Sequence, residues 1–171
     1  MKKLLVIASI ATAMLTGCTP SAEQINKTAY AIGSAAGLVA NQVNVDASAR
    51  NAVVDILGEV RTCVPEQGQT FEATWTPVID RVISDMVSQG RITASVGTII
   101  KPVAVIAAQA VDYMFDTRFP EAKKYEELVR AGVSGVIDGF LTVFKPANTK
   151  AGVKPEYDEE AYNYFYKKYY N

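Results

Sequence analysis

The 171-residue chain contains no histidine, only two cysteines and a single tryptophan. The absence of histidine excludes Ser-His-Asp and Cys-His catalysis and every histidine-ligated metal site. Two cysteines are too few for a cysteine-rich zinc site. The formal charge of −1 lacks the basic excess that a nucleic-acid-binding surface needs. We therefore expect no cofactor, no metal and no nucleic-acid partner.

The balance of residue types is that of a folded protein. Hydrophobic residues make up 49% of the chain and charged residues 20%, close to globular averages, so the chain as a whole is not a disordered tail. Its length suits one ordinary domain.

The first residues have the order of a secretory signal. Lys2 and Lys3 precede an uncharged apolar stretch, residues 4–15, which is too short for a comfortable bilayer span. The run Leu15-Thr16-Gly17-Cys18 then resembles the lipobox of bacterial lipoproteins, in which a branched aliphatic residue and small residues precede a cysteine. A plain secretory signal that happens to contain a cysteine is the alternative.

This resemblance to bacterial lipoproteins implies an exported protein held at a membrane by lipid. Residues 1–17 would be removed, and Cys18 would carry a diacylglycerol thioether and, in many bacteria, an acyl chain such as palmitate on its amine. In lipoproteins of diderm bacteria, an aspartate directly after the cysteine favours retention in the inner membrane. This chain has Thr19 at that position, so we expect transfer to the periplasmic face of the outer membrane if the host is diderm. Residues 18–22 form a tether, of which the last four reach only about 13 Å. The domain should sit close to its membrane.

The charge left after processing also bears on the anchor. Removal of Lys2 and Lys3 takes the formal charge from −1 to −3. A mildly acidic domain gains no attraction to anionic lipid, so the acyl chains must hold it there.

The mature sequence predicts an all-α, compact bundle of four to five helices over residues 23–144. Apolar residues recur at helical spacing over residues 23–42, and again over residues 47–62 behind Asp46, a favourable N-cap. Gly132, Gly135 and Gly139 lower helix propensity in the last predicted helix. This cost suggests that they allow tight packing, and we expect the partner to be Ala29 and Gly33 of the first helix.

The middle of the chain predicts further helices. Residues 77–89 show the clearest amphipathic pattern, with Thr76-Pro77 as the expected start and Gly90 as the stop. Residues 92–115 are nearly continuous apolar sequence, which Pro102 should kink or split into a buried helix pair. The β-branched residues over 98–106 leave a strand as the alternative there.

The last bundle helix is expected to open at Phe119-Pro120-Glu121 and to end near Phe144. Cys63 lies on the apolar stripe of the helix over residues 47–62, which favours a buried, inert thiol over an intermolecular disulfide.

Three carboxylates invite a catalytic interpretation. Asp112 and Asp116 are four residues apart, so they could share a helical face, whereas Asp138 lies on a polar stripe with Arg130 and Thr142. An acid–base pair or a cation site would need further oxygens or a second partner, which no nearby motif supplies. We favour a solvated helix face for Asp138 and a polar helix end for Asp112 and Asp116.

The C-terminal region differs in composition from the bundle. Residues 145–156 read as a linker, and residues 157–171 as a tail with six tyrosines and one phenylalanine. On a short helix, Tyr162, Phe165, Tyr166 and Tyr169 would share a face, while a period of two would allow a strand that pairs with a partner sheet. The tail could cap the bundle, bind a partner through these four residues, or remain disordered.

Taken together, these patterns predict a membrane-anchored lipoprotein without catalytic activity, acting as a structural or adaptor component of the cell envelope with a protein partner. No small-molecule substrate is evident. The alternative is a protein that binds lipid or inserts into membrane through the apolar segments 29–40, 97–111 and 131–144. A carboxylate-based envelope enzyme is the third hypothesis.

Overall fold

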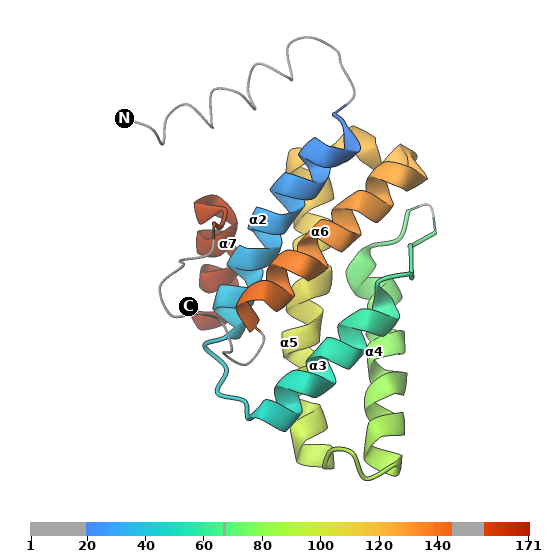
Figure 1. Cartoon of the computed structure of the whole chain (residues 1–171), viewed down its shortest axis with the longest axis vertical. Coiled ribbons are helices and arrows are strands. Elements are labelled where there is room, and N and C mark those ends of the chain that lie inside the picture. The colour runs from blue at the N-terminus through green and yellow to red at the C-terminus, as the bar shows by residue number, and fades with distance from the viewer. Residues whose placement is uncertain (1–19, 67, 145–155) are drawn as a thin grey trace.

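The computed structural model describes residues 20–66, 68–144 and 156–171 and confirms an all-α, compact fold (Figure 1). These residues form six α-helices and two shorter helical turns and contain no strand. The helices are α2 (Ala22–Ala40), α3 (Ala47–Val60), α4 (Phe71–Ser88), α5 (Ala94–Tyr113), α6 (Glu126–Phe144) and α7 (Glu159–Tyr170), and the turns are η1 (Met114–Arg118) and η2 (Pro120–Lys124). The predicted signal segment and most of the predicted linker lie outside the described residues.

Helices α2 and α6 form the closest pair, and they run parallel. Three polar side chains on α2 donate hydrogen bonds to carbonyl oxygens on α6: Asn26 to Ala131 at 3.1 Å, Ser34 to Gly139 at 3.3 Å and Asn41 to Val143 at 2.9 Å. The partners are 105, 105 and 102 residues apart in sequence, and this nearly constant separation means that both helices point the same way.

Glycines let the two backbones approach. A methyl group placed on Gly33 would lie 2.7 Å from the carbonyl carbon of Val136, and one placed on Gly135 would lie 2.7 Å from the Cβ of Ala29. A side chain at Gly139 would meet the backbone of Tyr30. The predicted packing of these glycines against the first helix is therefore confirmed for Gly135 and Gly139. The remaining glycine of the predicted set, Gly132, instead faces Met114 and Phe115.

Helices α2 and α3 each begin after a capping side chain, of which Asp46 was predicted. Ser21 and Gln24 form a reciprocal capping box at the start of α2, with Gln24 N–H donating to Ser21 Oγ at 3.2 Å. Asp46 accepts from Ala49 N–H at 2.8 Å at the start of α3. In the loop that follows α3, Cys63 is half-buried, and its carbonyl accepts a hydrogen bond from Trp75 Nε1 at 2.8 Å. The expected buried thiol is thus only partly enclosed.

The predicted start of α4 at Pro77 was wrong, because the helix begins at Phe71 and contains Pro77. Thr70 caps it by accepting from Ala73 N–H at 3.1 Å. Asp112 of α5 accepts from the first two amides of the helix, Phe71 N–H at 2.7 Å and Glu72 N–H at 2.9 Å. Two amides of the first turn are therefore satisfied by a residue that is 41 and 40 positions away in the sequence. The predicted stop was right, since Gly90 follows the helix with a φ of +68°.

Helix α5 corrects two expectations. Residues 94–113 form one helix that passes through Pro102 and continues into the π-helical turn η1, so it is neither split into a pair nor a strand. Pro102 lies on the exposed side, where its ring does not enter the core. Within the described residues, the one helical stretch long and apolar enough to cross a membrane is Ala94–Arg118. Of its apolar 18-residue window, 56% is buried inside the fold.

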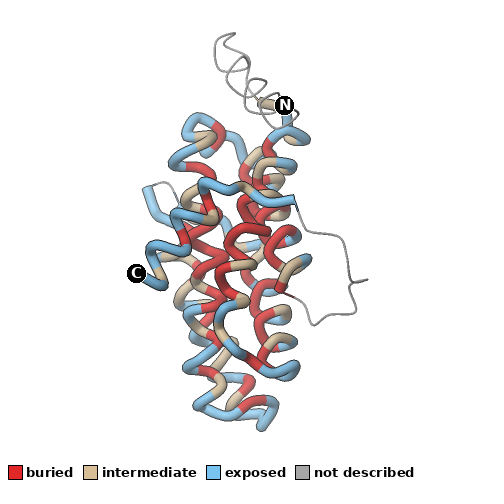
Figure 2. Tube along the Cα trace, turned by 90° about the vertical axis from the view of Figure 1, so that its left-hand side faces the viewer, coloured by how far each residue is buried: buried red, intermediate tan, exposed pale blue. Residues whose placement is uncertain are grey.

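Helix α6 also begins later than predicted. Residues 120–124 form the 3₁₀ turn η2, and Tyr125 is extended with a φ of −118°, so that α6 starts at Glu126. The buried residues come from all six helices and form one core, and Figure 2 shows them in red towards the inside of the bundle. Helices α3 and α4 lie against the lower half of α5, and α7 lies against the upper half of the bundle beside α2 (Figure 1).

Candidate functional site

The tyrosine-rich tail folds into α7, as the helical alternative predicts. Asp158 caps it by accepting from Ala161 N–H at 2.8 Å. Two glutamates lie in the first turn and two lysines in the last, which matches both ends of the helix dipole. The tail therefore has the local signals for a helix, although its mean composition is polar.

One face of α7 packs onto the bundle. Ala161 and Phe165 are completely buried, and the Phe165 ring lies 5.7 Å from that of Tyr113 on α5. The Tyr169 hydroxyl donates to Gln109, one of two buried polar side chains among the described residues. Of the alternatives for the tail, the structure thus agrees with the one in which it caps the bundle.

Polar bonds hold both ends of α7. At its start, Asp158 N–H donates to the Ala31 carbonyl at 3.1 Å, and Arg118 of η1 reaches Asp158 at 3.2 Å and Glu160 at 2.7 Å. At its end, the Tyr170 hydroxyl donates to the Val39 carbonyl at 3.2 Å. Burial lowers the pKa of the Arg118 guanidinium, and the negative charges of Asp158 and Glu160 raise it. The carboxylates have the larger effect together, so this pKa lies above its usual value.

The outward side of α7 carries a continuous row of tyrosines. The ring centroids of Tyr157 and Tyr162 are 5.7 Å apart, those of Tyr162 and Tyr166 are 5.8 Å apart, and those of Tyr166 and Tyr170 are 5.5 Å apart. Three of the four side chains are exposed, at 43% for Tyr157, 40% for Tyr166 and 41% for Tyr170. We call these four residues the tyrosine row.

The predicted partner-binding residues divide between these two sides. Tyr162 and Tyr166 belong to the tyrosine row, whereas Phe165 is in the core and Tyr169 is half-buried against Gln109. Sequence reasoning missed Tyr170, although its spacing of four residues from Tyr166 was a usable signal. Tyr157 precedes the helix, so helical periodicity could not have predicted that it lies in the tyrosine row.

The candidate carboxylates are each engaged in the fold. Asp112 caps α4, and burial raises its pKa even though the amides of Glu72 and Phe71 act in the opposite direction. Asp116 pairs with Lys123, and Asp138 pairs with Arg61 across the α3–α6 contact. Among the described residues, no three or more aspartate, glutamate, cysteine or histidine side chains are placed to hold a metal ion.

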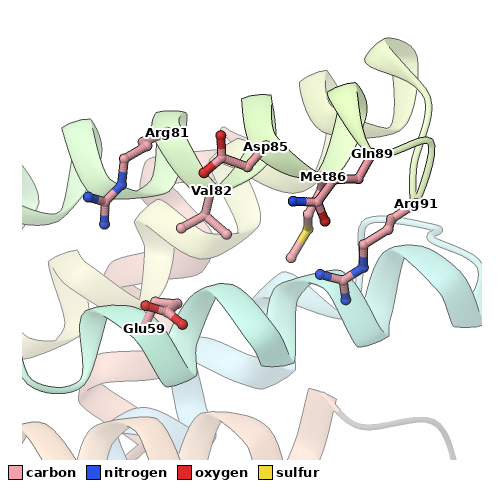
Figure 3. A pocket seen from close by; sticks show the side chains of 7 residues that line it. All are labelled: Glu59, Arg81, Val82, Asp85, Met86, Gln89 and Arg91. Atoms are coloured by element: carbon pink, nitrogen blue, oxygen red, sulfur yellow. The ribbon is translucent and has the colours of Figure 1, made fainter.

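Two shallow depressions lie on the lower half of the bundle. The first, of about 260 Å³, lies between α3 and α4, and its lining includes Glu59, Arg81, Asp85 and Arg91, whose charges balance (Figure 3). Arg91 is already paired with Asp55 of α3. The second, of about 420 Å³, is a groove between α4 and α5. Neither depression is enclosed, and the charged groups that line the first are of both signs, so the tyrosine row remains the most distinctive surface of the described residues. Comparisons of the chain with known protein families, curated proteins and solved structures found no match.

Proposed function

We propose that this protein is a lipid-anchored, non-catalytic interaction component of the cell envelope, which binds a protein partner through the tyrosine row. The signal-like segment and the lipobox resemblance at Cys18 support the anchor. The single observation that carries the binding role is the row itself, which is aromatic, partly exposed and fixed to a packed bundle.

The chemistry of the row suits a protein partner. Tyrosine combines a large apolar ring with a hydroxyl and loses little side-chain entropy on binding, which is why it is enriched at the energetic centres of interfaces. Stacking of Tyr162 on Tyr166 at 23° fixes both rings before any partner arrives. The packing of Phe165 and the bonds of Asp158 fix the helix that carries them. Such preorganisation lowers the entropy cost of association.

The carboxylates support a role without catalysis. An acid–base pair needs two groups that can reach a substrate. Asp112 and Asp116 instead face different partners, the start of α4 and Lys123. The lipid-binding alternative gains no particular support, because the apolar segments that it requires pack against one another in the bundle.

A pair of photo-crosslinking variants tests the binding role. We would replace Tyr166 by p-benzoylphenylalanine in the full chain, irradiate cells, and identify adducts by mass spectrometry. The matched control is the same replacement at Tyr164, which lies on the same helix and is 46% exposed but contacts Tyr113 on the other side. We expect one defined protein adduct at Tyr166 and little or none at Tyr164.

The anchor is tested separately. Metabolic labelling with an alkynyl fatty acid should mark the full chain, and Cys18→Ala should abolish both the label and membrane fractionation.

The two experiments can fail independently. Equal crosslinking adducts at Tyr164 and Tyr166, or no adduct at Tyr166, would reject the tyrosine row as an interface. An unlabelled chain would reject the lipid anchor.

A further inference from the structure

The position of the lipidated residue relative to the first helix determines how the bundle meets its membrane. Cys18 precedes Ser21 by three residues, so their Cα atoms can be at most about 11 Å apart. Ser21 is fixed by its capping box with Gln24. Ile25, one turn later, is completely buried. The start of α2 is therefore a rigid part of the bundle that cannot leave the bilayer surface.

The parallel α2–α6 pair shows which other residues lie at that end. Asn26 is level with Ala131, 105 residues further along. The same separation places Glu126, the first residue of α6, level with Ser21. Tyr125 and η2 come immediately before Glu126, and η1 at the end of α5 lies beside them (Figure 1). We call η1, η2 and Tyr125 the anchor end of the bundle.

The surface of the anchor end fits the headgroup region of a bilayer. Tyr125 is 49% exposed, and an exposed tyrosine is favourable where one end of the ring is apolar and the other is wet. The cations are paired with acids rather than free: Lys123 with Asp116, Lys124 with Glu121, and Arg130 with Glu126. The anchor end therefore has no concentrated charge of either sign, and it can approach lipid without repulsion and without selecting anionic headgroups.

From these observations we infer that the lipid bilayer is the partner of the anchor end, so that the bundle stands upright on it. This inference rests on the proposed lipid anchor at Cys18. The turn between α4 and α5 then points away from the membrane, because the 20 residues of α5 span about 30 Å. Helix α7 starts beside Arg118 and Ala31, near the middle of α2, and ends beside Val39, so the tyrosine row runs along one side of the bundle in the direction away from the membrane.

Site-directed fluorescence quenching tests this orientation. The mature lipidated protein carrying Cys63→Ser would receive one cysteine for bimane labelling, either Lys124→Cys in η2 or Ser95→Cys at the opposite end of α5. Both positions are exposed. Each protein would be reconstituted into phosphatidylethanolamine–phosphatidylglycerol vesicles containing a phospholipid with a nitroxide on its headgroup. We expect quenching at position 124 and none at position 95.

The outcomes separate the orientation from the anchor on which it rests. Quenching at position 95 alone, or equal quenching at both positions, would overturn the upright orientation while leaving the lipid anchor in place. A protein that lacks the diacylglycerol mass on its N-terminal peptide and does not float with the vesicles would overturn both. Similar quenching at position 124 in vesicles without phosphatidylglycerol would support the neutral character of the anchor end.

Discussion

A single methyl group added at Gly33 tests the α2–α6 interface directly. In Gly33→Ala, the new Cβ would lie 2.7 Å from the carbonyl carbon of Val136 and 2.8 Å from its Cα. These are backbone atoms of a packed helix, so no rotamer change can relieve the overlap. The helices must move apart by about 1 Å to restore an ordinary carbon–carbon contact of about 3.5 Å.

The energetic cost follows from what this separation disturbs. Overpacking of a core costs about 1–3 kcal/mol. Separation also strains the hydrogen bonds from Asn26, Ser34 and Asn41 to carbonyls of α6, each contributing about 1 kcal/mol. We expect Gly33→Ala to lower the free energy of unfolding by about 3 kcal/mol or more.

The matched control is Gly58→Ala, the same change at an exposed position of α3 where an added methyl group meets nothing within 4 Å. Alanine loses less backbone entropy than glycine in a helix, so this variant should gain about 0.5–1 kcal/mol. Urea unfolding of residues 18–171 carrying Cys18→Ser, followed by circular dichroism, measures both. Two effects of the same sign and size would refute the close approach of the α2 and α6 backbones.

Three further variants probe the tail and the start of α4. Phe165→Ala removes a completely buried ring, and we expect a loss of about 3 kcal/mol with faster hydrogen exchange in α7 and unchanged exchange in α2; unaltered α7 exchange would contradict its docking. Burial raises the pKa of Tyr169 from 10.0 to about 12, so the stability that it contributes is complete below pH 10 and is lost as the pH rises towards 12. Tyr169→Phe should reduce this alkaline decline in urea midpoints, to which Tyr113 and Tyr170 also contribute because burial raises their pKa values, and an identical decline would show that Tyr169 does not contribute to it. Asp112→Asn keeps one acceptor oxygen for two amides, so we expect a cost of about 1–2 kcal/mol in thermal unfolding, and an unchanged melting temperature would argue against its capping role.

The pairing of the first and last bundle helices could be predicted from sequence, because glycines in a helix are costly unless something packs against them. Gly135 and Gly139 indicated such a contact, and Ala29 lay on a matching stripe. Local caps were equally informative: Asp46 and Gly90 mark a helix start and a helix end because their effects extend over only a few residues.

The start of α4 and the side of α7 that faces the bundle could not be predicted in this way. The first turn of α4 depends on Asp112, whose sequence position gives no hint that it meets Phe71. In the tail, the periodicity grouped Phe165 with Tyr166, but which of the two turns inward depends on the surface of α5 that receives it. Both failures come from contacts between residues that are distant in sequence.

The parallel arrangement of α2 and α6 has a consequence for how the protein folds. The chain is synthesised from its N-terminus, and Ser34 must wait for Gly139, 105 residues later, before its hydrogen bond can form. At about 5–20 residues per second, that interval is roughly 5–20 s. Throughout it, the small-residue stripe of α2 has no native partner, and closing so long a loop slows the final step. Helix α2 is therefore among the first segments to be made and among the last to reach its native packing.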